Sequence, residues 1–250
     1  MGRRVVVAAE VSEHPVPAHA AGDCLGELLE RGGPGAELVL VAVTAPVAGA
    51  LEDVMGAVRE LLSPEVSLGV VVASVLGGAG EVEERAAVMV FGVWDREPGE
   101  SPPVRPVQLS TRPAPGGAET LGLDELRGAH GTLLLFADPF SVDLGALLDD
   151  LHTVAPDLVV VGGNLSGGRQ AGANRMVLGD GPITSLGAVG VWIGPEVPSE
   201  VVVAQGGRAI GRRLTATTVE LSPDLTRIVA LDGRPALDVL DALLDDLGPE

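Results

Sequence analysis

The sequence predicts an α/β fold, in which a layered mixed sheet with flanking helices is built from two similar strand–helix–strand halves. Short apolar runs, each of strand length, alternate with longer stretches whose apolar residues recur at helical spacing. Glycine and proline separate these runs, as expected of turns. The same succession of strand, helix and strand then returns in the second half of the chain, which indicates an internal duplication.

The duplication is visible in the spacing of apolar residues after two prolines. In the first half, the residues five, eight, nine and twelve positions after Pro46 are Leu51, Val54, Met55 and Val58. In the second half, the residues at the same offsets from Pro139 are Leu144, Leu147, Leu148 and Leu151. We therefore divide the chain into residues 1–122 and 123–250, and expect the ligand site in the crevice between the two halves.

Each element of the first half follows from its apolar pattern and its breakers. The expected elements are a strand over 3–11, a helix over 18–31, a strand over 38–43, a helix over 51–62 and strands over 68–75 and 86–94. The glycines and proline at 32–35 end the first helix, whose buried face is predicted by its stripe of Ala21, Leu25 and Leu28. Cys24 lies beside that stripe, so we expect a buried structural thiol and not a nucleophile.

The remaining elements are separated by proline-rich and glycine-rich segments. The middle of the chain predicts a loop over 95–106, a short strand over 107–110 and a linker over 113–122. The later elements are strands over 132–136, 158–161, 175–178, 186–193, 201–204, 214–221 and 226–231, with helices over 144–151 and 237–247. The turn at 179–182 is of the kind that joins antiparallel strands, so we expect the strands on either side of it to pair.

Composition excludes several classes of function. The net charge of −19 argues against binding to nucleic acid phosphates or to an anionic membrane surface. The chain has no lysine, which excludes a phosphate-loop lysine and a Schiff base, and no tyrosine. A single cysteine fits a reducing cytoplasm. The amino terminus does not read as a signal peptide and no apolar run is long enough to span a membrane, so we expect a cytoplasmic protein.

The sequence does not predict an enzyme or a cofactor. It has none of the nucleophile-elbow, zinc-helix or paired-cysteine motifs. Asp149, Asp150, His152 and Asp157 could in principle hold a divalent ion, but neighbouring residues on a helix point in different directions, and a solvated helix end is the simpler interpretation.

Charged residues beside glycine turns favour ligand binding. Gln205 and Arg208 stand in a glycine turn that includes Gly206, and Arg234 follows Asp232-Gly233 in a second turn. Arginine presents a planar fork suited to a carboxylate. Asp138 follows a strand and could attract an ammonium group, with Ser141 capping the next helix. Together these groups could bind the ammonium and carboxylate groups of an amino acid. The alternative interpretation is that Asp138 belongs to a simple turn and that Arg208 and Arg234 form surface ion pairs.

The same residues carry a family resemblance. Gln205-Gly206-Gly207-Arg208-Ala209-Ile210-Gly211 and the later Leu231-Asp232-Gly233-Arg234-Pro235-Ala236-Leu237 are similar to the FIST sensory domain, as are the segments at 136–141, 161–164 and 187–190, in the same order. The resemblance implies a sensor of small ligands, including amino acids, with Gly163 and Asn164 in the site. The family usually has Cys-Arg-Pro where this chain has Gly207-Arg208-Ala209, and its carboxy-terminal domain is represented here only by a truncated start.

Two functions are therefore expected from the sequence, in this order. The first is a cytoplasmic sensory domain that binds a small metabolite and signals through a partner protein. The second is a protein-interaction or scaffold module without a small ligand, which would use the acidic last helix and self-association as a homodimer.

Overall fold

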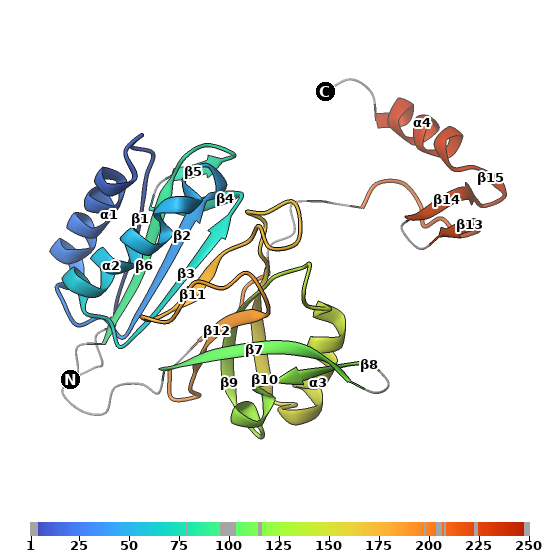
Figure 1. The fold of residues 1–250 in the computed structure, drawn as a ribbon. Helices are drawn as coiled ribbons and strands as arrows, with labels where there is room; N and C mark the ends of the chain where they lie inside the picture. The colour runs from blue at the N-terminus through green and yellow to red at the C-terminus, as the bar shows by residue number, and fades with distance from the viewer. Residues whose placement is uncertain are drawn as a thin grey trace. The chain divides into compact units, whose positions relative to one another are not determined.

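The computed structural model describes residues 5–247 except 79, 96–103, 115–116, 198, 204–206, 208 and 223–224. The chain divides into two compact units, Met1–Val201 and Val202–Glu250. Among the described residues, the first unit contains two five-stranded sheets and a two-stranded hairpin, and the second contains a three-stranded sheet and a helix (Figure 1). None of the described helices is long and apolar enough to cross a membrane.

The first sheet and its helices come from the amino-terminal part of the chain. Their bounds are β1 Val5–Ser12, α1 Pro17–Gly32, β2 Leu38–Thr44, η1 Ala45–Ala50, α2 Leu51–Leu62, β3 Val66–Val72, β4 Ser74–Gly77, β5 Gly80–Glu83 and β6 Val88–Asp95. The strand order is β1-β6-β2-β3-β11, where β11 is Met176–Leu178. Strands β2 and β3 are parallel, and β6 is antiparallel to β2.

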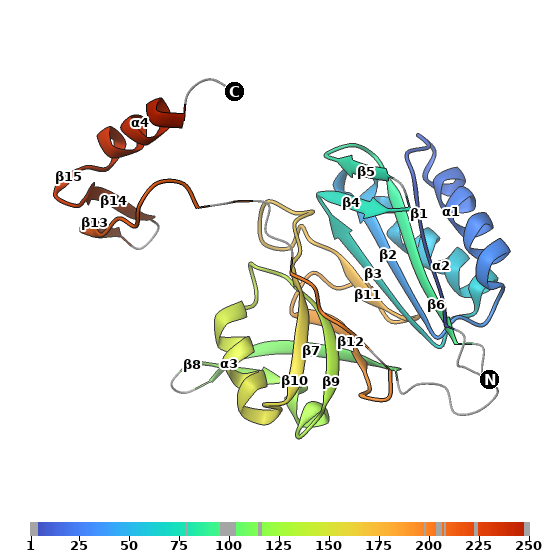
Figure 2. The same ribbon diagram turned by 180° about the vertical axis from the view of Figure 1, so that it is seen from behind.

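The second sheet forms from the later part of the first unit. Its elements are β7 Val104–Ala114, β8 Gly117–Leu121, η2 Leu123–Leu126, β9 Gly131–Ala137, α3 Leu144–Val154, β10 Leu158–Asn164 and β12 Ala188–Ile193. The strand order is β10-β9-β12-β7-β8, with β9 and β10 parallel and β12 antiparallel to β9 (Figure 2). The predicted α/β class, with mixed sheets and flanking helices, is confirmed.

The two sheets share one strand order. In the first sheet, β1, β6, β2 and β3 are neighbours in that order; in the second, β7, β12, β9 and β10 are. Each series has two antiparallel pairings followed by a parallel pair whose strands are connected by a helix. This common topology is what a duplicated strand–helix–strand unit would produce, and it supports duplication as our interpretation of the repeat.

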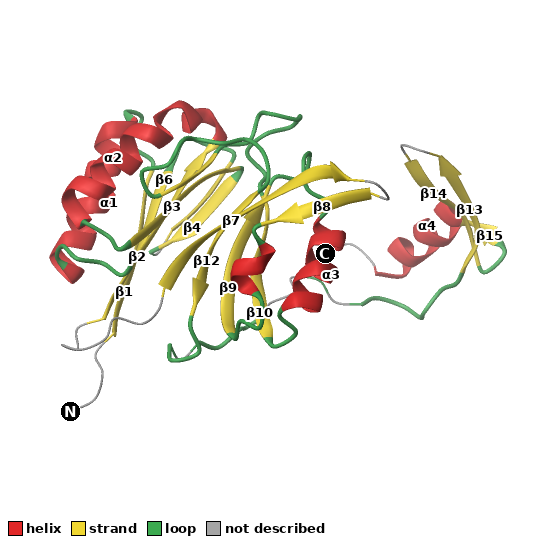
Figure 3. Ribbon diagram, turned by 60° about the horizontal axis from the view of Figure 1, so that its bottom comes forward, coloured by secondary structure: helices red, strands yellow, loops and turns green. Residues whose placement is uncertain are grey.

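Alternating side chains stack the two sheets and their helices in layers. In β2, Val39 and Val41 pack in the core under α1 and α2, whereas Leu38 and Ala42 pack in a second core that includes Val189 of β12. Side chains of a strand alternate between the two faces of a sheet, so β2 serves both cores at once. A third core joins the opposite face of the second sheet to α3 and η2. The order of layers is helices, sheet, sheet, helix (Figure 3).

The second unit is a hairpin followed by a helix. Its elements are β13 Ala216–Ser222, β14 Leu225–Leu231, β15 Arg234–Pro235 and α4 Ala236–Leu247. Asp232 and Gly233 both have positive φ, 49° and 77°, as the two-residue turn between β14 and β15 requires. The apolar face of α4 is not fully packed, because its residues Leu237, Leu240 and Leu244 are 72%, 47% and 52% exposed.

Three sequence expectations about single elements were wrong. The segment 113–122, expected to be a linker, ends β7 and forms β8, which pairs with β7 as a hairpin. The strands on either side of the turn at 179–182 do not pair with each other along their length, because β11 joins β3 in the first sheet and β12 joins β7 and β9 in the second. Residues 201–203 are exposed and form no strand, and Ala204 is outside the described residues.

Candidate functional site

Asp138 lies at the carboxyl edge of the parallel pair β9–β10. It follows Ala137, the last residue of β9, which is in register with Asn164 at the end of β10. Side chains alternate along the strand, so Asp138 continues the face of Phe136, which packs in the core between the two sheets. The edge beyond the carboxyl ends of parallel strands is where α/β folds usually bind ligands.

The carboxylate of Asp138 is fully buried and only half partnered. Its exposure is 0%, and the side-chain amide of Asn174, also 0% exposed, donates to Oδ1 over 2.8 Å. The second oxygen, Oδ2, has no hydrogen-bond partner within the described part of the chain. A buried polar atom without a partner costs free energy, and more so when the group is charged, so Oδ2 calls for a structural or functional explanation.

A glycine-rich loop, residues 165–175, covers this carboxylate. The loop begins where Leu165 N donates to Ala137 O over 2.8 Å, and it is closed where Gly168 N donates to Asn174 Oδ1 over 2.7 Å. The amide that holds Asp138 is therefore fixed by the loop itself.

The covering loop is also anchored to the first sheet. Ala73 N, just after β3, donates to Ser166 Oγ over 3.0 Å, and Val71 N donates to Arg175 O over 3.0 Å. At Gly167, an added Cβ would lie 2.5 Å from a methyl carbon of Val71, so only glycine fits this close approach. The carboxyl ends of β3 and β10 thus meet at the loop that covers Asp138.

Ser141 has a different role from the one expected. Asp143 is the N-cap of α3, since its Oδ1 accepts from Ala146 N over 3.1 Å. The hydroxyl of Ser141 instead accepts from Gly187 N over 2.9 Å, and Asp138 N donates to Gly187 O over 2.9 Å. Ser141 therefore ties the segment after β9 to the start of β12.

The structure brings together only part of the predicted site. Asp138, Ser141, Gly163 and Asn164 all lie at or just beyond the carboxyl ends of β9 and β10. Arg234 is exposed and belongs to β15 in the second unit. The predicted residues outside the described part of the chain are Gln205, Gly206 and Arg208.

Sequence reasoning missed Asn174 and Ser166, which hold the loop in place. Both stand in a glycine-rich segment, but asparagine and serine are common in loops for local reasons. The separation of 36 residues between Asn174 and Asp138 gives no local signal of their pairing.

The remaining titratable side chains in the described part of the chain are engaged in local contacts or lie apart. Among the described residues, no three His, Cys, Asp or Glu side chains are grouped as a metal would need. Asp150 accepts from the hydroxyl of Thr120 over 2.8 Å, and His130 lies 3.8 Å from Asp157. Burial raises the pKa of the Cys24 thiol to about 12, with a further contribution from the charge of Glu10, so this cysteine is structural as expected.

Comparison with known proteins identifies the family. Residues 37–234 match the FIST N domain. The chain belongs to the FIST family. FIST domains are sensory domains of signal transduction. The match includes both sheets of the first unit except for strand β1, and it leaves out helix α1.

Mycobacterial relatives extend the comparison over nearly all of the chain. An uncharacterized protein of Mycobacterium tuberculosis strain H37Rv is 32% identical over 242 residues, which are 96% of this chain and 60% of the relative. An uncharacterized protein of Mycobacterium bovis is 31% identical over 198 residues, 79% of this chain and 48% of the relative. The chain thus spans about 60% of the length of the first of these curated relatives.

Proposed function

We propose that this FIST chain is a cytoplasmic sensory domain that binds an amino acid without turning it over and signals through a partner protein. The observation that carries the proposal is the buried, unpartnered Oδ2 of Asp138. An ammonium group supplies both the positive charge and the hydrogen-bond donor that a buried carboxylate needs.

The loop over Asp138 supplies groups for the other end of the ligand. It carries Arg169 and Arg175, whose exposed guanidinium groups suit a carboxylate. Arg208 and Arg234, which the sequence suggested for the same role, belong to the second unit. A ligand with an ammonium and a carboxylate group fits this combination better than a simple cation.

The loop also offers a way to report binding. It joins the end of β3 through Ser166 and Arg175 to the end of β9 through Asn174. A ligand that bonds Asp138 Oδ2 binds only conformations in which the loop admits it, so it shifts the population toward them. Such a shift changes the contact between the edges of the two sheets, which a partner protein can recognise.

The test is a thermal-shift panel of amino acids on the wild-type chain and on Asp138→Asn. Ligand binding to the native state raises the melting temperature by mass action. We expect one class of amino acid to raise it in the wild type and to have no effect in Asp138→Asn, which keeps the shape but loses the charge. Asp149→Asn is the matched control, since it removes an exposed carboxylate on α3 and should keep the response. An equal response in Asp138→Asn would refute the proposed site.

A second candidate function is a protein-interaction module without a small ligand. The exposed apolar side chains of the second unit favour it, since Leu221 is 79% and Leu237 is 72% exposed. If no amino acid stabilised the wild-type chain, this candidate would replace the sensor.

A further inference from the structure

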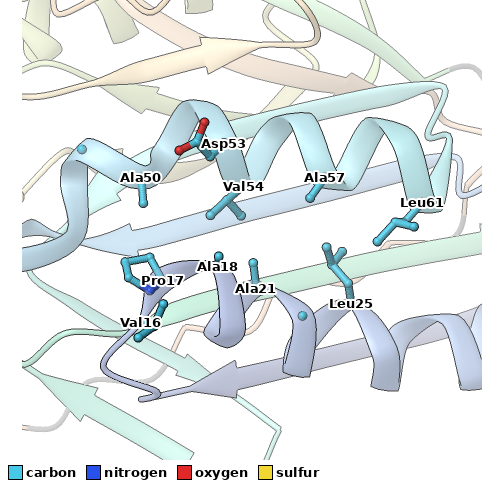
Figure 4. A pocket seen from close by; sticks show the side chains of 12 residues that line it. Val16, Pro17, Ala18, Ala21, Leu25, Ala50, Asp53, Val54, Ala57 and Leu61 are labelled. Carbon is cyan, nitrogen blue, oxygen red and sulfur yellow. The ribbon is translucent and has the colours of Figure 1, made fainter.

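A groove of about 490 Å³ runs between α1 and α2 on the outer face of the first sheet (Figure 4). Its floor is apolar, with Leu25 of α1 on one side and Val54 of α2 on the other. Val16 and Leu61, which also line it, are 46% and 43% exposed, values that mark apolar surface open to solvent. Exposed apolar surface gathered in a concave site is typical of an interaction surface.

Small side chains keep the groove open. The small residues that line it are Ala18, Ala21, Gly22, Gly49, Ala50 and Ala57. Where such residues face one another, two helices pack without filling the space between their outer edges. The open space is shaped by two helices, so it suits the side chains of a third helix laid along it.

The helices beside the groove are strongly acidic. Together, α1 and α2 carry six carboxylates and two arginines. Both arginines are engaged: Arg31 lies 3.5 Å from Glu10 and from Glu27, and Arg59 donates to Gly179 O over 2.9 Å. The acidic residues of the two helices are Asp23, Glu27, Glu30, Glu52, Asp53 and Glu60.

Most of these carboxylates are available to an outside cation. Within the described part of the chain, Glu30, Glu52, Asp53 and Glu60 have no ion pair. Asp53 also lines the groove itself. An apolar groove between two helices that together carry an excess of four negative charges favours an occupant that is apolar on one side and positively charged on the other.

We infer that the groove between α1 and α2 docks a basic amphipathic helix of a partner protein. The apolar face of that helix would enter between Ala18 and Ala57, and its lysines or arginines would be attracted by Asp53 and by the other carboxylates of the two helices. An anionic membrane would be repelled by the same carboxylates. The inference gives the signalling partner of the proposed sensor a binding surface, but it does not depend on which ligand binds at Asp138.

The experiment titrates the whole chain into a fluorescent two-heptad leucine–lysine peptide of amphipathic design, with no amino acid ligand present. We expect saturable binding that weakens with added salt. The charge-reversing variant Asp53→Lys, at the carboxylate that lines the groove, should lower the affinity about tenfold, because charges at the edge of an interface steer and stabilise an oppositely charged partner. Ala18→Trp, at an exposed lining position, should block the groove and abolish binding.

Two controls separate the groove from general attraction to an acidic protein. Asp149→Lys changes an exposed carboxylate on α3 and should leave the affinity unchanged, and a leucine–glutamate peptide of the same pattern should not bind. Circular dichroism of Ala18→Trp checks that the fold is kept. Binding that survives both groove variants, or a preference of the chain for anionic vesicles over the peptide, would overturn the inference. Because the titration contains no amino acid, its outcome is distinct from failure of the Asp138 site.

Discussion

The side chains of Asp138 and Asn174 form a buried pair in which each depends on the other. Asn174 supplies the one hydrogen bond that the carboxylate of Asp138 receives from the described residues. A carboxylate deprived of this partner stays buried with neither oxygen satisfied. The stability of the native state should therefore depend strongly on Asn174, even though it is a loop residue.

We predict that Asn174→Ala lowers the free energy of unfolding by about 3 kcal/mol, since it strands a buried charged acceptor. Removing both partners in Asp138→Ala with Asn174→Ala should cost less than the sum of the single changes, with a coupling of at least about 1 kcal/mol. Urea unfolding of the four proteins measures this cycle. Additive losses would show that the pair does not interact in solution.

At the residue scale, the sequence located one side of this pair and not the other. Asp138 was predicted because an aspartate between the end of a strand and the start of a helix could attract an ammonium group. Asn174 was not, because its pairing is decided by how a loop returns across the sheet edge. Gly163 and Asn164 were suggested by family resemblance alone, and the structure places them at the same edge.

The start of α3 shows how an element is set by one side chain. The first turn of a helix has free backbone N–H groups, and an aspartate at the N-cap accepts from one of them. Asp143 does so here through Ala146 N, whereas Ser141, two residues earlier, bonds Gly187 N. Sequence reasoning chose Ser141 because both residue types are good caps and helix starts are uncertain by a residue or two.

We predict that Asp143→Ala lowers the free energy of unfolding by about 1 kcal/mol through loss of this cap. Asp143→Asn should restore most of the loss, because asparagine also accepts from the N–H group. Thermal unfolding followed by far-ultraviolet circular dichroism measures the difference. If Asp143→Asn were as unstable as Asp143→Ala, the charge and not the hydrogen bond would be responsible.

At the element scale, most strands and helices could be predicted, but their partners could not. Apolar periodicity identified α1, α2 and α3 and the central strands of both sheets, since burial of one face fixes that pattern. It did not show that β11 crosses to the first sheet while β12 stays in the second, because both strands are apolar and short. The full length of β7 was not predicted because prolines at 106 and 113 usually interrupt a strand. In the structure both prolines are accommodated within the extended strand.

At the scale of the whole molecule, the two units differ in how well they bury apolar side chains. All three hydrophobic cores consist of residues between Val6 and Ile193, within the first unit. In the second unit, by contrast, the described residues include eleven large hydrophobic side chains that are at least 36% exposed, among them Leu221 and Leu237. A unit of about fifty residues that buries so little apolar surface is marginally stable by itself.

We predict that a fragment of residues 1–201 folds cooperatively, with a melting temperature within about 3 °C of the whole chain, because the removed unit adds little to the buried cores. Trp94 and Trp192, 2% and 8% exposed, lie in this unit and report its packing by fluorescence. A fragment ending at residue 185 is the matched control. It lacks β12, which pairs with both β7 and β9 in the centre of the second sheet, and should not fold. If residues 1–201 unfolded more than about 10 °C below the whole chain, the second unit would contribute substantially to the stability of the first.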